Sequence, residues 1–458
     1  MISNDLPVSW LPVLLNDVGE VVTGKTPSTK SPNNFGGDIP FIKPADLDNS
    51  GYITRTAETL TDLGASAVPT VPANSILVTC IGNLGKVGIT NRTSATNQQI
   101  NTLVSSSLVE HRFFYYQLQT LKPWMRENAS ATTVTIINKG KFSKAPVALA
   151  PLAEQKAIAD KLDTLLAQVE NTKARLERIP QILKRFRQSV LAAAVSGRLT
   201  EEWRGQNSVS ITDWDALTVG DVATVATGKT PSRKEPKYWK DGDVPWLTSA
   251  STGAIYTELA EQFVTKRAVD ECSLKVFPPG TLLLAMYGEG KTRGQVTELR
   301  LSATCNQACA SVTADERKIL RSYLKLRLLE NYEETRKAAA GGAQPNLNLN
   351  KVRAISISVP DKEEQTEIVR RVDQLFAHAD RIEQQVNNAL ARVNSLTQSI
   401  LAKAFRGELT EQWRKENPEL ISGENSAEAL LERIRSERAA QKPTRRRTKI
   451  GKTEQAAK

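Results

Sequence analysis

The sequence predicts an α+β protein that contains two similar α/β globules and two long coiled-coil helices, related by a pseudo-twofold internal repeat. Two observations lead to this fold class. The chain repeats its motifs at an offset that starts at 204 residues and settles at 210, and each copy ends in a heptad pattern of apolar residues. Copies of this length are too long for solenoid repeats, so they are duplicated half-molecules. Two such halves tend to associate about a pseudo-twofold axis, and the alternative is that they act independently.

The internal repeat consists of short matched motifs that occur in the same order in both copies. The matched pairs are Val22–Ser28 with Ala226–Ser232, Gly37–Phe41 with Gly242–Trp246, Ile76–Gly82 with Leu282–Gly288, Ala95–Gln98 with Thr304–Gln307, and Leu199–Arg204 with Leu409–Arg414. We therefore assign 1–150 and 205–358 to two globules, 151–204 and 359–414 to two helices, and 415–458 to a tail.

Each globule is predicted to mix short strands with helices. Apolar runs bounded by Gly, Pro and Asn indicate buried strands, and longer segments without these breakers indicate helices. The predicted strands are Ile76–Ile81, Thr281–Met286 and Ile355–Val359, and the predicted helices are Arg112–Leu121 and Ile319–Glu334.

The two long helices follow from a seam of apolar residues. Such residues recur at alternating steps of four and three over Ile158–Val190 and, in the same phase, over Ile368–Ile400. This spacing is typical of a coiled coil, so each seam has the other as its obvious partner. The alternative is that each helix packs only on its own globule.

Proline and glycine mark the ends of both helices. Pro151 and Pro360 stand at the starts, and Gly197 and Gly407 stand just past the ends, which are the positions that these residues prefer. Pro180 lies inside the first helix, where it removes a backbone hydrogen bond and should bend the axis.

The segment 415–458 lacks an apolar period and finishes with a basic run over Lys442–Lys452. We predict that this tail is disordered. Its positive charges either contact phosphates or only keep the tail in solution.

Composition narrows the class of protein. The chain has 61 Lys plus Arg against 50 Asp plus Glu, a net charge of +11, which favours a polyanionic partner. Four cysteines without a CxxC pair and two histidines cannot form a zinc site, and they suit a reducing compartment. The first residues lack the apolar core of a signal peptide, and no apolar run approaches the ~18 residues of a membrane span, so we expect a cytoplasmic protein.

Three segments match a loose phosphate-binding loop, but their context argues against nucleotide binding. The segments are Gly19–Thr26, Ala223–Thr230 and Ala285–Thr292. A functional loop of this kind opens a helix. Pro27 and Pro231 disfavour a helix after the first two, and the β-leaning Gln295–Thr297 follows the third. Because cofactor loops and nucleophile–base pairs are also missing from the sequence, we predict that the chain is not an enzyme.

A basic, duplicated chain in which two globules are each followed by a heptad helix resembles the specificity subunit of type I restriction–modification systems, over residues 10–414. The most specific motifs are Pro-Leu-Ala-Glu-Gln at 151–155 and Pro-Asp-Lys-Glu-Glu-Gln at 360–365, where the helices start. The resemblance implies that each globule is a target-recognition domain that reads one half of a split, asymmetric sequence in double-stranded DNA. It also implies that the two helices pair antiparallel and set the spacing between the halves.

The same resemblance implies partners and cofactors. Two methyltransferase subunits would dock on this chain to form an adenine-N6 methyltransferase that uses S-adenosylmethionine. Two motor–nuclease restriction subunits would add cleavage that uses ATP and Mg²⁺. The specificity subunit itself would bind no cofactor.

The repeat separates the candidate DNA-binding residues into two classes. Residues shared by both globules cannot distinguish two different half-sites, so they suit phosphate contacts or the fold; these are Lys25, Thr26, Asn97, Gln98, Lys229, Thr230, Asn306 and Gln307. Base-reading residues are expected where the copies diverge; these are Lys30, Lys86, Arg233, Lys234, Lys291 and Arg293. Asn and Gln also pair bidentately with adenine, so a base common to both halves remains open. Each charge alternatively serves only solubility.

Two other functions are compatible with the sequence. A phosphate-loop enzyme would bind ATP by itself and lose it on Lys291→Ala. A coiled-coil scaffold with protein partners only would show no salt-dependent affinity for DNA.

Lengthening either long helix by one turn should change the number of bases between the half-sites and leave both half-sequences unchanged. Half-sites read from one face lie about 10 bp apart, and a helical turn adds about 5.4 Å to the spacer. Sequencing the sites methylated by the lengthened chain measures this spacing. An unchanged spacing would refute the role of the helices as a spacer.

Overall fold

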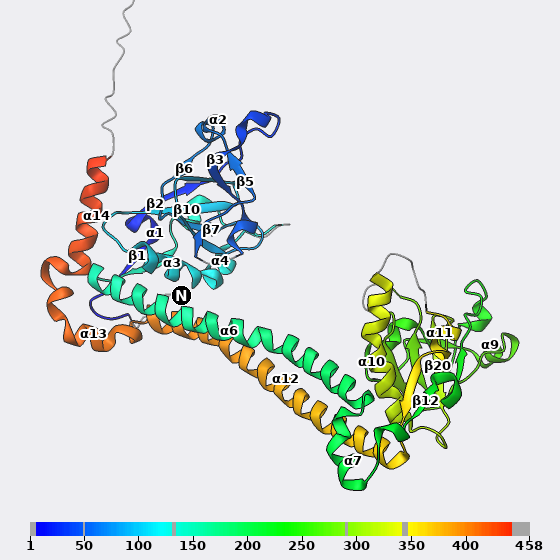
Figure 1. Cartoon of the computed structure of the whole chain (residues 1–458). Helices are drawn as coiled ribbons and strands as arrows, with labels where there is room; N and C mark the ends of the chain where they lie inside the picture. Colours follow the sequence, from blue (N-terminus) through cyan, green and yellow to red (C-terminus); the bar gives the residue numbers. More distant parts are fainter. Residues whose placement is uncertain (1–5, 49–50, 131–133, 289–291, 341–346, 442–458) are drawn as a thin grey trace, which may run out of the picture. The chain divides into compact units, whose positions relative to one another are not determined.

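The computed structural model describes residues 6–48, 51–130, 134–288, 292–340 and 347–441 (Figure 1). The chain divides into two compact units, the first made of Met1–Arg175 with Ala389–Lys458 and the second of Leu176–Asn388. These divisions fall inside the two long helices. Each unit therefore contains one globule, the start of one long helix and the end of the other.

The globule of the first unit contains three sheets. Strands β1 (Leu11–Leu14) and β11 (Pro146–Leu149) pair antiparallel and join the globule to the long helix. A five-stranded sheet has the order β2-β10-β7-β8-β4, with β2 Gly19–Thr23, β4 Tyr52–Ile53, β7 Ile76–Thr79, β8 Val87–Thr90 and β10 Ile100–Ser105. A four-stranded sheet has the order β5-β3-β9-β6, with β3 Phe35–Ile42, β5 Glu58–Leu60, β6 Thr70–Val71 and β9 Ser94–Thr96. The helices are α1 Leu15–Val18, α2 Asp62–Ser66, α3 His111–Gln119, α4 Lys122–Asn128 and α5 Lys139–Phe142.

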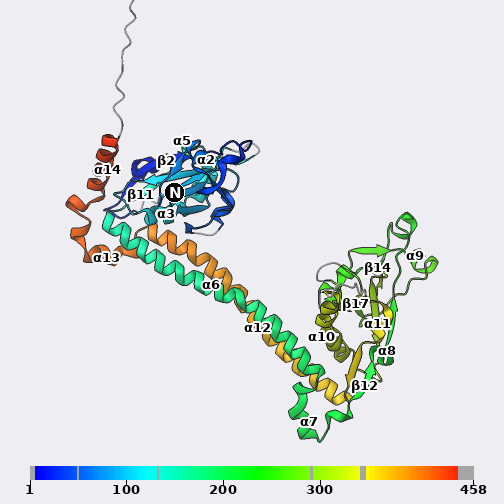
Figure 2. The ribbon, with the colours of Figure 1, turned by 45° about the horizontal axis from the view of Figure 1, so that its top comes forward.

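The globule of the second unit repeats this topology. Strand β12 (Asp215–Thr218) pairs with β21 (Ser356–Val359). The five-stranded sheet has the order β13-β20-β17-β18-β15, with β13 Ala223–Thr227, β15 Tyr256–Thr257, β17 Leu282–Ala285, β18 Val296–Leu299 and β20 Cys309–Ala314. The smaller sheet has the order β16-β14-β19, with β14 Val244–Leu247, β16 Gln262–Val264 and β19 Thr304–Cys305. The helices are α8 Val219–Val222, α9 Lys266–Glu271, α10 Arg321–Ala340 and α11 Leu349–Arg353, and α10 lies beside the sheet (Figure 2).

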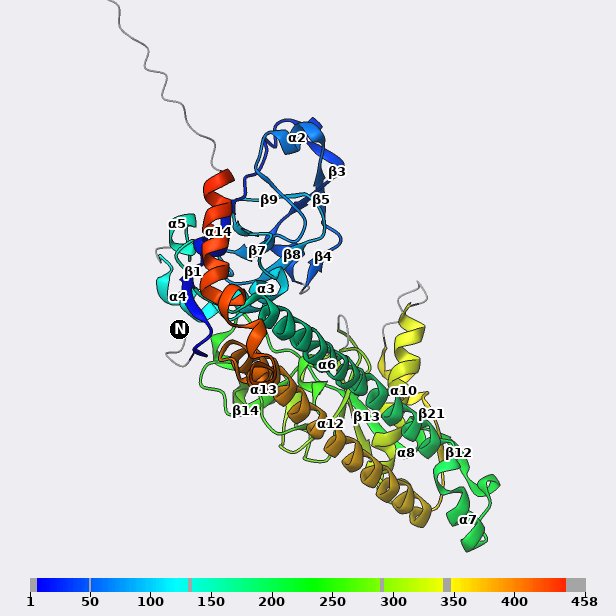
Figure 3. The same cartoon turned by 90° about the vertical axis from the view of Figure 1, so that its left-hand side faces the viewer.

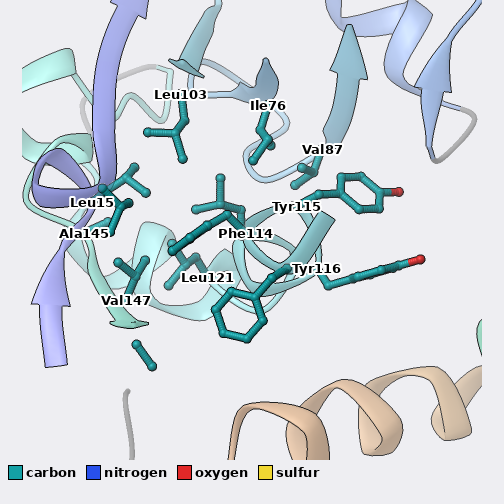
Figure 4. Close-up of a cluster of buried hydrophobic side chains, with 14 of the residues drawn as sticks. Leu15, Ile76, Val87, Leu103, Phe114, Tyr115, Tyr116, Leu121, Ala145 and Val147 are labelled. Carbon is teal, nitrogen blue, oxygen red and sulfur yellow. The ribbon is translucent and has the colours of Figure 1, made fainter. Parts of the chain in front are cut away.

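The five elements predicted inside the globules are confirmed. Strands β7, β17 and β21 lie within the predicted apolar runs, and α3 and α10 occupy the predicted helices. In the first unit, Leu15, Ile76, Leu103 and Val147 gather around Phe114 of α3 (Figure 4). Such close packing of large apolar side chains is the main stabilising term of a core of this kind.

The long helices are α6 (Leu152–Val195) and α12 (Lys362–Phe405), 44 residues each. They end before Gly197 and Gly407, both at φ 76°, a left-handed conformation that glycine adopts without strain. Helix α6 continues through Pro180, and the bend expected there stays a prediction.

The helices pair antiparallel within each unit, and they also pack on the globules. In the first unit, Ile158 and Leu162 of α6 share one core with Ile400 of α12 and with the globule. In the second unit, Arg187 Nη2 lies 2.6 Å from Asp380 Oδ1, and just past the end of α6 the Leu199 carbonyl accepts from Arg371 of α12. The predicted pairing of the two long helices is confirmed. The alternative, in which each helix packs only on its own globule, is wrong.

Two glutamates at the helix starts are fully buried. In the second unit, Glu364 accepts hydrogen bonds from Thr200 Oγ1 at 2.7 Å, Arg204 Nη1 at 2.6 Å and Trp214 Nε1 at 2.9 Å. These donors come from the segment after α6 and from the segment before β12. A buried carboxylate is stable only when it is paired and hydrogen-bonded, so this node fixes the second globule to both helices.

The first unit contains the equivalent node around Glu154. This carboxylate accepts from Trp10 Nε1 at 2.8 Å and from Thr410 Oγ1 at 2.6 Å, and it pairs with Arg414. Here the donors come from opposite ends of the chain. The node therefore joins the N-terminal segment to the segment that follows α12.

The glutamine that follows each buried glutamate fixes the helix start to its own globule. Gln155 Nε2 donates to the Ala150 carbonyl at 2.7 Å, and its Oε1 accepts from the Glu110 amide at 2.9 Å. Gln365 does the same with the Pro360 carbonyl and the Leu320 amide. The Glu-Gln pair of both motifs is thus explained by structure.

The prediction of a disordered tail over 415–458 is wrong for the described residues 415–441. After α13 (Glu411–Glu416), the chain forms α14 (Ala427–Gln441), in which Leu430, Leu431 and Ile434 are buried in the core of the first unit. Three large apolar residues in a short segment of mostly charged residues and alanines do not give a visible period. They form a helix because the globule offers them an apolar surface. The basic run from 442 onward lies outside the described residues.

Replacing Glu364 with Ala should lower the free energy of unfolding of the second unit by about 3–5 kcal/mol, because Arg204 keeps a buried charge without its partner. Hydrogen exchange should accelerate around 198–218 and 362–370 and stay unchanged around the Glu154 node. Glu363→Ala, on the same turn but exposed, is the matched control. Equal acceleration in both units would contradict two independent nodes.

Candidate nucleic-acid interface

The two shared motifs of each globule form adjacent turns. In the first unit the Thr-Gly-Lys-Thr turn follows β2 and the Asn-Gln turn precedes β10, and these strands are antiparallel neighbours. The Lys25 amide donates to the Thr96 carbonyl at 2.9 Å, and Thr26 Oγ1 donates to Gln98 Oε1 at 2.7 Å. In the second unit Thr230 Oγ1 donates to Gln307 Oε1 at 2.6 Å.

The glycine of each Thr-Gly-Lys-Thr turn is required by close approach of the other turn. A Cβ on Gly24 would lie 2.1 Å from Thr96 Oγ1, and a Cβ on Gly228 would lie 1.6 Å from the Cys305 carbonyl oxygen. Any side chain there would push the two turns apart.

The shared asparagines are engaged inside the fold. Asn97 is 7% exposed, its backbone amide donates to the Ile42 carbonyl, and its Oδ1 accepts from the Gln99 amide at 3.1 Å. Asn306 bonds the Leu247 carbonyl and the Ala308 amide in the same way. Both side chains shape the turn that presents Gln98 or Gln307 at the surface.

The candidate lysines differ in their surroundings. Lys25, Lys30 and Lys234 are exposed, and so is Lys229, whose Nζ lies 3.4 Å from the Cys272 carbonyl oxygen. Lys86 is instead half-buried, because its ammonium pairs with Asp48 and also reaches the Pro44 carbonyl at 3.4 Å. Lys291 lies outside the described residues.

The two candidate arginines of the second globule differ in their surroundings. The Arg233 guanidinium stacks 3.7 Å from the centroid of Trp239 and 4.8 Å from that of Trp246, and its Nη2 donates to Gln262. Arg293 is half-buried, and its Nε has no hydrogen-bond partner within the described residues. No sequence pattern indicates the stack, because its members lie on separate elements.

A groove between β4, α3 and α6 of the first unit carries aromatic and charged side chains that sequence reasoning missed. Tyr52 bonds His111 Nε2 at 2.8 Å, and Asp163 of α6 pairs with Arg112 at 2.5 Å and accepts from Tyr116. Burial lowers the pKa of His111 and raises the pKa of Tyr116. These contacts join α3 to the long helix, so they position the globule.

The second unit fills the matching place with cations. Lys325 Nζ lies 3.9 Å from the centroid of the Tyr256 ring and 3.1 Å from Glu298 Oε2, and Arg300 lies over the same ring at 4.0 Å. Burial lowers the pKa of Lys325, although Glu298 opposes this. The two globules therefore share a topology but differ in the chemistry of their surfaces.

The first two phosphate-loop segments do not lead into the helix that a nucleotide-binding loop needs. The described residues after Thr26 and Thr230 run without regular structure to single 3-10 turns at Pro32–Asn34 and Pro236–Tyr238. The third segment includes 289–291, outside the described residues. Within the part of the chain that the structure describes, there is also no cluster of metal-binding side chains and no helix long and apolar enough to cross a membrane.

Comparison with known proteins gives consistent matches over most of the chain. The family described as "Type I restriction modification DNA specificity domain" matches residues 7–181 and 211–392. The type I restriction enzyme EcoDI specificity subunit of Escherichia coli is 37% identical, over 96% of this chain and 98% of that protein. The EcoKI specificity subunit of E. coli strain K12 is 33% identical over 96% and 98%.

Solved structures resemble the fold. The HsdS subunit from Thermoanaerobacter tengcongensis aligns with a TM-score of 0.58 at 18% identity, over 88% of this chain and 98% of that chain. A chain from a structure of the type I R-M system, described by its complex assembly and conformational transition, aligns with a TM-score of 0.69 at 17% identity, over 88% and 99%. The two family matches fall on the two units, one on each globule and its helix, and the chain belongs to the family of type I restriction–modification DNA specificity subunits.

Proposed function

We propose that this chain selects the DNA target of a type I restriction–modification enzyme, with each globule reading one half of a split, asymmetric duplex sequence. The observation that carries this proposal is the pair of adjacent turns, built by the same hydrogen bonds in both units but surrounded by different side chains. A shared frame with divergent surroundings suits two half-sites of different sequence. The net charge of +11 suits binding to a polyanion.

The exposed shared lysines suit contacts to phosphates. Lys25 and Lys229 extend from turns whose backbone is hydrogen-bonded to neighbouring segments, so both side chains start from fixed backbone positions. Phosphate contacts fix register without reading sequence, which is what residues common to both globules can do. We assign Asn97 and Asn306 to holding the turns, and Thr26, Gln98, Thr230 and Gln307 to fixing one turn against the other.

The divergent residues are proposed to choose bases. Arg233 is the strongest candidate, since its guanidinium is exposed yet oriented by the two tryptophans, and arginine pairs bidentately with guanine. Lys30, Lys234, Lys291 and Arg293 remain candidates for their own globules. Lys86 is engaged by Asp48, and we assign it to holding the loop between β7 and β8.

Partners would supply the chemistry. We propose that two methyltransferase subunits carry S-adenosylmethionine and methylate adenine N6, and that two motor–nuclease subunits carry ATP and Mg²⁺. The paired helices α6 and α12 would be the frame that separates the half-sites. The complex would act in the cytoplasm, where its DNA lies.

Lys25→Ala should weaken DNA binding and reduce its salt dependence. The slope of log K against log salt should fall by about 0.9, because one phosphate is no longer neutralised by an ammonium group. Lys86→Ala is the matched control and should leave that slope unchanged, because its ammonium is already neutralised by Asp48. Fluorescence anisotropy of the complex with its methyltransferase subunit, on a duplex containing the target, measures both slopes. A slope that changes only for Lys86→Ala would reverse the two assignments.

Sequencing the methylated bases of a methylation-free host should reveal a split motif with N6-methyladenine in both halves when this chain is expressed with its cognate methyltransferase subunit. A host with the methyltransferase subunit alone is the control and should show no such motif. Arg233→Ala should relax the sequence in one half only. Methylation in a short continuous motif, or none, would instead support the scaffold or the nucleotide-binding function.

A further inference from the structure

Helix α14 lies on the first unit alongside β1 and contacts α1 (Figure 3). Its Leu430 and Ile434 are no more than 1% exposed, and with Leu431 they belong to the core that includes Val13 and Val18 of the globule. The last described segment of the chain is therefore built into the unit that contains the first.

Polar contacts place the end of α14 against one end of the neighbouring strands β2 and β10. Glu437 accepts from Ser106 Oγ at 2.8 Å and from Ser107 Oγ at 3.1 Å, directly after β10. The Arg438 guanidinium donates to the Asn16 carbonyl, just before β2. Because the Ser106 amide also donates to the Val18 carbonyl at 2.9 Å, these contacts hold the start of β2 against the end of β10.

The opposite ends of the same two strands carry the candidate interface. Strand β2 leads into the turn with Lys25 and Thr26, and β10 begins after the turn with Gln98. Each strand is only five or six residues long, so a shift at one end is transmitted to the turns at the other.

The second unit has no helix at the matching place within its described residues. The segment from α7 (Glu201–Asn207) to β12 holds only the 3-10 turn Ile211–Asp213. An open groove remains there, lined in part by Asp215, Lys318 and Lys362.

Those three positions are leucines in the first unit. Leu11 and Asp215 start the first strand of each globule, Leu152 and Lys362 start the long helices, and Leu108 and Lys318 precede the buried Val109 and Ile319. The leucines pack against the core that includes α14. Charged residues at these sites would be desolvated under an apolar helix, so the face of the second unit is suited to water.

In the second unit, contacts within the globule occupy the regions that α14 contacts in the first. Lys318 Nζ donates to the Asp221 carbonyl of α8 at 2.8 Å, one residue after the position equivalent to Asn16. The Asp315 amide donates to the Val222 carbonyl, as the Ser106 amide donates to the Val18 carbonyl in the first unit. The Asp315 carboxylate pairs with Arg317 at 2.9 Å.

We propose that α14 is a positioning segment for DNA reading by the first unit alone, so that the C-terminal helix controls the half-site read by the N-terminal globule. This inference rests on the proposed function. It assigns Arg438 and Glu437 to holding β2 and β10 in the register that places their turns, and it assigns no such role in the second unit.

The first test uses hydrogen exchange on the full chain without DNA. Arg438→Ala should speed exchange in β2 and β10 about tenfold, because a charged hydrogen bond is removed, and should leave β13 and β20 unchanged. Arg438→Lys should restore protection, since lysine also donates to the Asn16 carbonyl. Arg435→Ala, exposed on the same helix, is the matched control. If β2 and β10 exchange at the wild-type rate both in Arg438→Ala and in a chain that ends before α14, the proposal is overturned.

The second test measures discrimination by the complex with its methyltransferase subunit, using duplexes altered in one half-site at a time. Arg438→Ala should lose at least about threefold discrimination at the half read by the first unit and keep it at the other. Removal of residues 442–458 alone should change neither. Equal loss at both halves, or faster exchange with unchanged discrimination, would overturn the positioning role. If the wild-type complex binds no duplex, the proposed function fails, while the exchange measurement still decides whether α14 holds the strands.

Discussion

The buried carboxylates of Glu154 and Glu364 are the interactions on which the architecture depends. Each is fully buried and is stable only while it is surrounded by an arginine and a threonine from one segment and a tryptophan from another. Around Glu364 the donors come from consecutive parts of the chain. Around Glu154 they come from its two ends, so Trp10 and Arg414 must meet if the carboxylate is to be buried. A tandem duplication thereby yields two equivalent units, although one is continuous in sequence and the other is not.

Contacts within the fold also explain which residues around the adjacent turns are shared by both globules and which diverge. The motif residues Gly24, Thr26, Asn97 and Gln98 are occupied with one another or with the strands beside them. A change in any of these alters the turn itself. Side chains around the turns make fewer contacts that the fold requires. Arg233 can therefore stack on two tryptophans in the second globule, whereas the first globule has Thr29, Phe35 and Phe41 at the equivalent positions. Sequence divergence is therefore tolerated where a recognition surface needs it.

Much of the fold was predictable because its signals are local. The seam of α6 and α12 repeats every heptad, and β7, β17 and β21 are apolar runs whose burial follows from their own composition. Proline and glycine marked the helix ends because backbone geometry demands them. Individual site residues were less predictable, since the environment of Lys86 depends on Asp48 and that of Arg233 on Trp239 and Trp246. These partners belong to other elements of the fold, so the spacing of residues in the sequence does not predict the contacts.

Helix α14 shows why the tail was mispredicted and what duplication leaves open. The first copy continues from α7 into β12 within a few residues, whereas the second copy continues past α13 into α14. The face of the globule that α14 covers must be apolar. The equivalent face of the second unit has no such cover and must be hydrated. Leucines at 11, 108 and 152 and charges at 215, 318 and 362 are these two solutions at equivalent places. The two copies are connected differently along the chain, and their equivalent surfaces therefore differ in chemistry. Although the two globules share one topology, the first holds its strands in place with α14 and the second does so without such a helix.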